Sequence, residues 1–161
     1  CGIDPPRAHG LDTVHTIEGM HSGDVKVFIG MGGNFASAAP DTAYTFEGLQ
    51  KCELTVQVST KLNRSHVIHG RQALILPCLG RTEMDVQKGG KQAITVEDSF
   101  SMVHASAGIL RPLSSQMKSE PAIVAGLAKA TLGNHPVDWD WLIEDYDRIR
   151  ELIAAEAFCR T

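Results

Sequence analysis

The fold is decided by the stretch Val25-Lys26-Val27-Phe28-Ile29-Gly30-Met31-Gly32-Gly33-Asn34, where an apolar run leads directly into a glycine-rich turn. The β-branched and aromatic side chains over 25–29 predict a buried strand. Glycine after a strand lets backbone N–H groups approach a phosphate or a base closely. A plain strand-to-helix turn explains these glycines equally well, because Phe35 replaces the third glycine of the dinucleotide fingerprint and no lysine follows as in a P-loop.

Two further apolar runs predict strands at 54–58 and 73–76, and Pro77 stops the second of them. Asp12 is expected to cap a helix that ends at Gly23, and Pro40-Asp41 to open another helix before the strand at 54–58. Strands that are separated by crossovers of ten or more residues pair in parallel, with helices on the faces of the sheet. The sequence therefore predicts an α/β fold with a mainly parallel sheet.

The remainder of the chain is less regular in its pattern. Residues 79–92 are expected to form a long loop, and 94–96 and 102–103 short strands. Ser119-Glu120-Pro121 begins a helix that Gly133-Asn134 closes. The apolar stripe Leu142, Tyr146, Ile149, Ile153 and Ala157 predicts one continuous last helix, with Glu144 and Arg148 paired on its outer face.

The composition is that of a globular domain: 161 residues, 43% apolar and 21% charged. No apolar run approaches the roughly 20 residues that cross a bilayer, so no membrane span is expected. The net charge of −4 argues against a nucleic-acid partner, although residues 51–91 hold seven basic residues against three acidic ones. That basic centre indicates a local anion partner, and chance clustering is the alternative.

The four cysteines, Cys1, Cys52, Cys78 and Cys159, are scattered and form no C-x-x-C motif. Neither a zinc ribbon nor a cluster-binding loop is therefore expected, and free thiols are typical of a reducing, cytoplasmic setting. His66 and His69 have no third metal ligand nearby and are interpreted as hydrogen-bonding histidines. Because residue 1 is Cys rather than Met, we interpret the chain as part of a longer protein.

Polar loops follow the second and third predicted strands. Ser59–His66 is almost wholly polar, and an asparagine such as Asn63 offers a base edge both a donor and an acceptor. Arg81-Thr82-Glu83-Met84-Asp85 brings two carboxylates that could serve acid–base chemistry or accept hydrogen bonds from a guanine. Solvated surface loops are the alternative for both segments.

Taken together, these loops resemble the molybdopterin-dependent oxidoreductases of the dimethyl sulfoxide reductase family. The runs Val56–His66, Ala73–Asp85 and Glu97-Asp98-Ser99 are most similar to the formate-dehydrogenase-like alpha subunits. The resemblance extends from Asp12 to about Gly133 and covers an internal part of the longer family polypeptide. It implies that residues 1–161 form a single three-layer Rossmann-like domain. This domain would contact one guanine dinucleotide arm of bis(molybdopterin guanine dinucleotide).

The resemblance also implies the residues that touch this cofactor. Gly32, Gly33 and Asn34 match the family's glycine-asparagine turn, and Leu76-Pro77 matches its strand end. The implied cofactor-binding residues are Gly32, Gly33, Asn34, Ser59, Thr60, Lys61, Asn63, Pro77, Arg81, Glu83 and Asp85. Phe35 departs from the family, which usually has proline at that place.

No catalytic residue and no metal ligand is expected within the chain. In the family the ligand of molybdenum or tungsten, and the optional iron–sulfur cluster, come from other regions of the polypeptide. The expected partners are therefore the remaining domains of the parent chain and the molybdenum cofactor, whose metal and pterin carry the redox chemistry. A stand-alone nucleotide-binding module and a non-catalytic interaction module are the alternatives.

Overall fold

The computed structural model describes residues 7–158, which form two compact units divided between Cys78 and Leu79. Residues 7–78 are called the N-terminal unit below, and residues 79–158 the C-terminal unit. The predicted α/β class with a parallel sheet is confirmed. That residues 1–161 act as a single domain stays a prediction.

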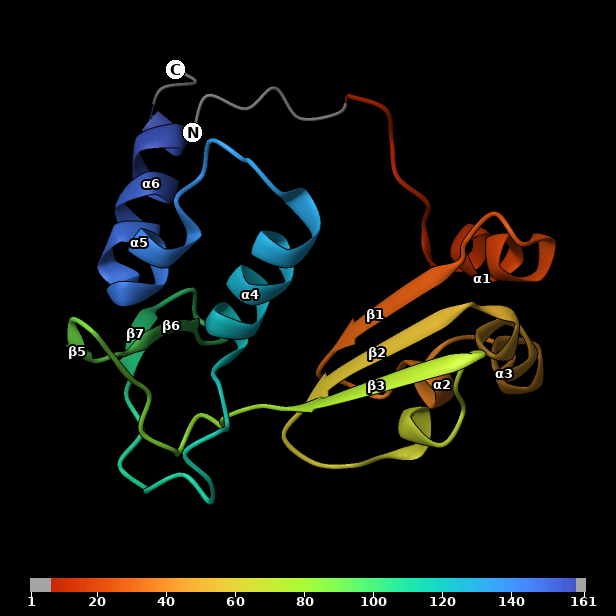
Figure 1. The fold of residues 1–161 in the computed structure, drawn as a ribbon, viewed down its shortest axis with the longest axis horizontal. Helices are drawn as coiled ribbons and strands as arrows, with labels where there is room; N and C mark the ends of the chain where they lie inside the picture. Colours follow the sequence, from red (N-terminus) through yellow and green to blue (C-terminus); the bar gives the residue numbers. More distant parts are fainter. Residues whose placement is uncertain (1–6, 159–161) are drawn as a thin grey trace. The chain divides into compact units, whose positions relative to one another are not determined.

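The N-terminal unit is built on a three-stranded parallel sheet in the order β1-β2-β3 (Figure 1). Its elements along the chain are α1 (Thr13–Ser22), β1 (Val27–Met31), α2 (Phe35–Ala38), α3 (Thr42–Lys51), β2 (Leu54–Ser59), the 3₁₀ turn η1 (Arg64–His66) and β3 (Gln72–Pro77). The first strand begins two residues later than predicted, because the N–H of Val25 donates to the carbonyl of Gly19 (2.9 Å) instead of joining the sheet.

The two helix starts predicted from aspartate are confirmed. The carboxylate of Asp12 accepts from the backbone N–H of His15 (2.9 Å), and that of Asp41 accepts from the N–H of Tyr44 (3.1 Å). Each carboxylate satisfies one of the backbone donors that a helix start leaves without a partner. Gly23 ends α1 in the left-handed conformation (φ 87°), where a side chain would be strained.

The core of the N-terminal unit lies between its helices and one face of the sheet. Met20 of α1, Ala36 of α2 and Leu49 of α3 are buried together with Cys52. Phe28 of β1 packs against this cluster, and its ring also contacts that of Phe35 (centroids 4.8 Å apart). Since Phe28 points to the helices, all three helices contribute to the same face of the sheet.

The C-terminal unit combines two short hairpins with three helices (Figure 1). Its elements are β4 (Val86–Gln87), β5 (Gly90–Lys91), β6 (Ile94–Glu97), β7 (Val103–Ser106), α4 (Glu120–Leu132), α5 (Trp139–Glu144) and α6 (Tyr146–Phe158). Both hairpins are antiparallel. The two short strands expected near 94–96 and 102–103 are confirmed, whereas the expected loop over 79–92 contains the β4–β5 hairpin.

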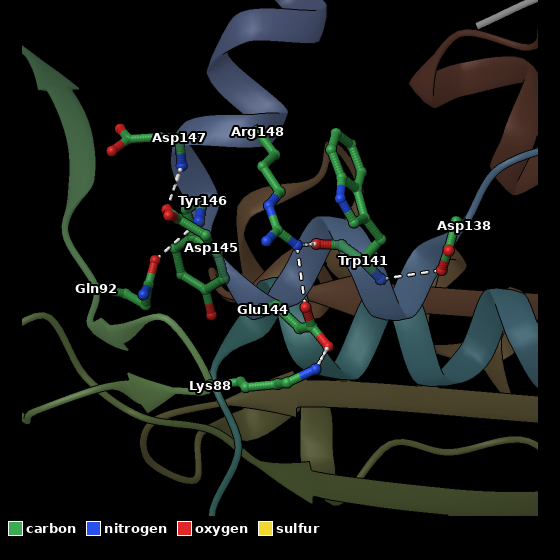
Figure 2. A network of polar contacts seen from close by, with 9 residues as sticks. All are labelled: Lys88, Gln92, Asp138, Trp141, Glu144, Asp145, Tyr146, Asp147 and Arg148. Carbon is green, nitrogen blue, oxygen red and sulfur yellow. Dashed lines mark hydrogen bonds and ion pairs between the residues drawn. The ribbon is translucent and has the colours of Figure 1, made fainter.

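The prediction of one continuous last helix is wrong, because Asp145 is extended (φ −152°, ψ 117°) and separates α5 from α6. The break is stabilised from the β4–β5 hairpin. The N–H of Gly89 donates to the carbonyl of Glu144 (2.8 Å), and the side-chain oxygen of Gln92 accepts from the N–H of Tyr146 (2.8 Å; Figure 2). The carboxylate of Asp145 also accepts from the N–H of Asp147 (3.0 Å). Distant partners thus replace the hydrogen bonds that a continuous helix would make.

The predicted pair of Glu144 and Arg148 forms across this break, at 3.1 Å, and Lys88 joins it at 2.6 Å (Figure 2). Hydrogen bonds from Lys88 and then from Arg148 hold the pKa of Glu144 below its usual value. The guanidinium of Arg148 also donates to the carbonyl of Trp141 (2.6 Å) and lies over its ring (4.8 Å). The side chain of Ala157 lies outside the described residues.

Replacing Leu49 by alanine is expected to lower the free energy of unfolding by about 2–5 kcal/mol, because the side chain is fully buried in the core of the N-terminal unit. Urea unfolding followed by far-ultraviolet circular dichroism measures this change. The matched control is Leu62→Ala, at a well-exposed leucine of the same unit, for which a change within about 0.5 kcal/mol is expected. Equal effects of the two substitutions would contradict the described core.

Candidate functional site

The carboxyl ends of the three parallel strands form one edge of the sheet. Met31 pairs with Val58, and Ser59 pairs with Pro77, so the strands end in register. The segments that follow the strands therefore start along this edge. Asn34, Ser59 and Pro77 therefore lie along one edge of the sheet, which we call the carboxyl edge.

The glycine turn after β1 is shaped by two left-handed residues. Gly32 and Gly33 both have φ +65°, and an added Cβ at either would meet nothing within 4 Å. The N–H of Gly32 donates to the carbonyl of Val58 (2.8 Å), which fixes the turn onto β2. The N–H groups of Gly33 and Asn34 have no hydrogen-bond partner among residues 7–158. Successive backbone donors in such a turn form a concave site for an anion.

Side chains from the loop after β2 hold the glycine turn in place. The amide of Asn63 donates to the carbonyl of Gly33 (2.7 Å) and its oxygen accepts from the N–H of Ser65 (2.9 Å). The hydroxyl of Ser65 donates to the side-chain oxygen of Asn34 (3.0 Å) and accepts from the N–H of Ala36 (3.0 Å). Ser65 is fully buried and joins the two loops. It was not among the predicted site residues, and the only signal for it was its place in the polar run Ser59–His66.

The other predicted residues of this loop lie at its surface. The hydroxyl of Ser59 donates to the carbonyl of Lys61 (2.9 Å), which closes a tight turn. Thr60 and Lys61 are exposed, and so is Arg64 at the start of η1. The loop therefore presents two cations to solvent beside a turn that offers anion-binding donors.

Two buried side chains near this loop carry polar atoms without a partner in the described chain: Nε2 of Gln57 and Nε2 of His66. Their residues are 6% and 8% exposed. Nδ1 of His66 accepts from the N–H of Asn63 (2.9 Å), so its proton lies on Nε2. A buried N–H donor without an acceptor costs about 1–3 kcal/mol, which a ligand or a bound water would relieve.

The remaining predicted site residues, Arg81, Glu83 and Asp85, belong to the C-terminal unit. Arg81 is exposed, and the carboxylate of Glu83 accepts from the N–H of Gly80 (2.7 Å). The carboxylate of Asp85 accepts from the amide of Gln87 (2.6 Å) and from the hydroxyl of Tyr146. Both predicted carboxylates therefore have hydrogen-bond partners within their own unit.

A buried polar cluster surrounds Tyr146, and sequence reasoning assigned this residue only to the apolar stripe. Its hydroxyl bonds to Ser119 (2.6 Å) as well as to Asp85, and both Tyr146 and Ser119 are buried. Burial, and then the hydrogen bond to Asp85, raise the pKa of Tyr146 well above its usual value. Asp85, Gln87 and Ser119 also line a cavity of about 680 Å³ in the C-terminal unit. These contacts tie the segment after β3 to α4 and α6.

Residues 7–158 contain no group of three or more His, Cys, Asp or Glu side chains placed to hold a metal ion. None of the helices in this range is long and apolar enough to cross a membrane. Cys52 is a free thiol, and the side chains of Cys52 and Cys78 are both buried, whereas Cys1 and Cys159 lie outside the described residues.

Curated relatives match nearly the whole chain but only part of their own length. Proteins named uncharacterized oxidoreductase from Mycobacterium tuberculosis and Mycobacterium bovis are each 60% identical over 155 residues, 96% of this chain and 20% of the relative. Protein YdeP of Escherichia coli K12 is 49% identical over 154 residues, again 96% of this chain and 20% of the relative. The chain therefore spans about a fifth of the length of these relatives. No family model matches it.

Removal of the Tyr146 hydroxyl by Tyr146→Phe is expected to destabilise the C-terminal unit by about 1–3 kcal/mol at pH 7, because an oxygen of Asp85 loses its donor. The raised pKa also predicts a pH dependence. As the pH rises the unfolded chain releases the phenol proton first, so this contribution is complete below about pH 10 and declines above it. The variant is expected to lack that decline.

Urea unfolding at pH 8 and at pH 11, followed by tryptophan fluorescence, measures both effects, because Trp139 and Trp141 lie in the same unit. The matched control is Tyr44→Phe, at a half-exposed tyrosine of the N-terminal unit. If the free energy of unfolding falls between pH 8 and pH 11 no more for the wild type than for Tyr146→Phe, the buried hydroxyl is not the cause of the decline.

Proposed function

We propose that this chain holds one guanine dinucleotide arm of bis(molybdopterin guanine dinucleotide) within a larger oxidoreductase. One observation carries the proposal: the carboxyl edge presents the N–H groups of Gly33 and Asn34 without a partner in the described chain, in a turn that Asn63 and Ser65 hold in place. Backbone donors arranged in this way bind phosphate oxygens. The oxidoreductase names of the mycobacterial relatives support the wider assignment.

The residues at this edge fit a nucleotide diphosphate. The two free backbone donors suit phosphate oxygens, and the exposed cations Lys61 and Arg64 add attraction for its charge. The buried Nε2–H of His66, in the loop after β2, has no acceptor in the described chain. Ser59, Thr60 and Pro77 border the same edge. Arg81, Glu83 and Asp85, which belong to the C-terminal unit, remain predictions that rest on the family resemblance alone.

The part of this chain in the reaction is to bind and orient. When bound, the metal and pterin would supply the redox chemistry, with molybdenum or tungsten as the metal. The similarity of Val56–His66, Ala73–Asp85 and Glu97-Asp98-Ser99 to formate-dehydrogenase-like alpha subunits supports a parent of that type. Any iron–sulfur cluster of the parent would lie outside this chain. The free thiol of Cys52 supports a cytoplasmic location.

A nucleotide-binding module without a redox parent would use the same edge. The length of the relatives favours the larger enzyme, because this chain matches only 20% of each. The two functions differ in a measurable way: only the oxidoreductase carries a metal and a pterin. A metal analysis of the longer protein therefore separates them.

Guanosine diphosphate is expected to bind the 161-residue chain weakly, near 1 mM or about −4 kcal/mol, because only part of the cofactor site lies on it. Chemical-shift mapping should place the changes on residues 32–34 and 59–66, and added salt should weaken binding. The Asn34→Ala change should cost about 1 kcal/mol through loss of a polar contact. The matched control is Asn134→Ala, at an exposed asparagine of the C-terminal unit. Shifts confined to α6, or none at high millimolar ligand, would contradict the site.

In the longer protein, Gly33→Val is expected to lower the content of molybdenum or tungsten several-fold. A β-branched residue is strained at φ +65° and would displace the backbone donors. Metal content by elemental mass spectrometry, and guanosine monophosphate released on acid hydrolysis, measure the loss. The control Gly126→Ala changes a helical glycine with open space around it and should leave both unchanged. Normal metal and nucleotide content in Gly33→Val would exclude this turn from cofactor binding.

A further inference from the structure

The sheet of the N-terminal unit has one face that carries almost no polar group. Because side chains alternate along a strand, every second residue of β1, β2 and β3 shares this face, in rows set by the register. Eight of the nine positions are apolar and none is charged; they are Val27, Leu54 and Gln72, then Ile29, Val56 and Leu74, then Met31, Val58 and Leu76. We call these nine positions the apolar sheet face.

The helices of the N-terminal unit pack on the opposite face of the sheet. Phe28, which alternates with the exposed residues of β1, contacts the buried cluster that α1, α2 and α3 share. On the apolar sheet face, Val27, Ile29 and Met31 of β1 are 51%, 54% and 43% exposed, whereas Phe28 on the opposite face is half-buried. Leu74 of the edge strand β3 is 42% exposed, and Ile75 on its opposite face is similarly exposed at 43%. Val56 and Val58 of the central strand are buried.

A parallel sheet with an uncovered face is physically unusual. Such sheets occur almost only with both faces covered, because their strands are apolar on both sides and cannot meet water. An antiparallel sheet that faces solvent alternates apolar and polar residues, and the apolar sheet face lacks that alternation. It has the composition of a buried layer.

We propose that an α-helix from the polypeptide beyond residues 1–161 covers the apolar sheet face in the longer protein. The matched region is only 20% of the relatives' length, so about four fifths of such a protein lies outside it. A segment of the same polypeptide loses less translational and rotational freedom on docking than a separate partner does, because the linkage raises its local concentration. This inference does not depend on the proposed cofactor.

The dimensions of the face fit one helix. Adjacent strands lie about 4.8 Å apart, so β1 and β3 are separated by roughly 10 Å, close to the diameter of a helix with its side chains. Strands of five or six residues are about 17–20 Å long, which matches a helix of roughly three to four turns. Because the face carries no charge, the covering helix must be amphipathic, with an apolar stripe toward Ile29, Val56 and Leu74.

Photo-cross-linking from Met31 tests what covers the face. The longer protein is produced with the diazirine analogue of methionine, illuminated, digested and analysed by mass spectrometry. We expect cross-links from position 31 to a peptide outside residues 1–161 with helical apolar spacing, and their loss in Met31→Leu while those from other methionines persist. Mixed isotope labelling identifies links between copies. The proposal would be overturned if position 31 cross-linked only to residues 1–161 or only to a second copy. It would also be overturned if the diazirine reacted with water alone.

Thiol labelling gives an independent measurement. In the longer protein, Ile29→Cys is expected to react with a maleimide at least about tenfold more slowly than Val67→Cys, because a covered thiol reacts only when the site opens. Val67 is 71% exposed and lies in a loop away from the apolar sheet face, which makes it the matched control. Reaction of both thiols at the same rate would show that the face is open and would overturn the proposal.

Discussion

The in-register parallel pairing of β1, β2 and β3 is the constraint on which the N-terminal unit depends. Parallel neighbours cannot be joined by a tight turn, so each connection must return along the sheet before the next strand begins. The connection that contains α2 and α3 builds the core on one face, together with α1. The same pairing gathers the strand ends at the carboxyl edge. The candidate site and the apolar sheet face are thus two consequences of one arrangement.

At the carboxyl edge the polar side chains act mainly on the backbone. Asn63 and Ser65 direct their hydrogen bonds to Gly33, Asn34 and Ala36. This leaves the N–H groups of Gly33 and Asn34 held in place before any ligand arrives. A preformed site loses little conformational freedom on binding, which raises affinity without additional contacts. The buried hydroxyl of Ser65 is therefore as important to the turn as the glycines themselves.

The features that the sequence predicted correctly depend on residues that are close together in the chain. Asp12 and Asp41 cap helices through bonds to residues three positions away, and the three strands follow from their own apolar runs. The failures depend on distant partners. The last helix breaks at Asp145 because Gly89 and Gln92, more than fifty residues earlier, satisfy the backbone groups on either side. Ser65 likewise acts on Asn34, 31 residues away. No periodicity within a short window carries such information.

The hydrogen bonds within the chain also show which predicted site residues have polar atoms that remain available to a ligand. The amide of Asn63 and the carboxylate of Asp85 each use both of their polar atoms within their own unit. The backbone donors of the glycine turn and Nε2 of His66 have no partner in the described chain. Backbone donors recognise charge and shape rather than base identity. In the proposed site the N-terminal unit would therefore bind the phosphates, and discrimination among bases would require groups from beyond its carboxyl edge.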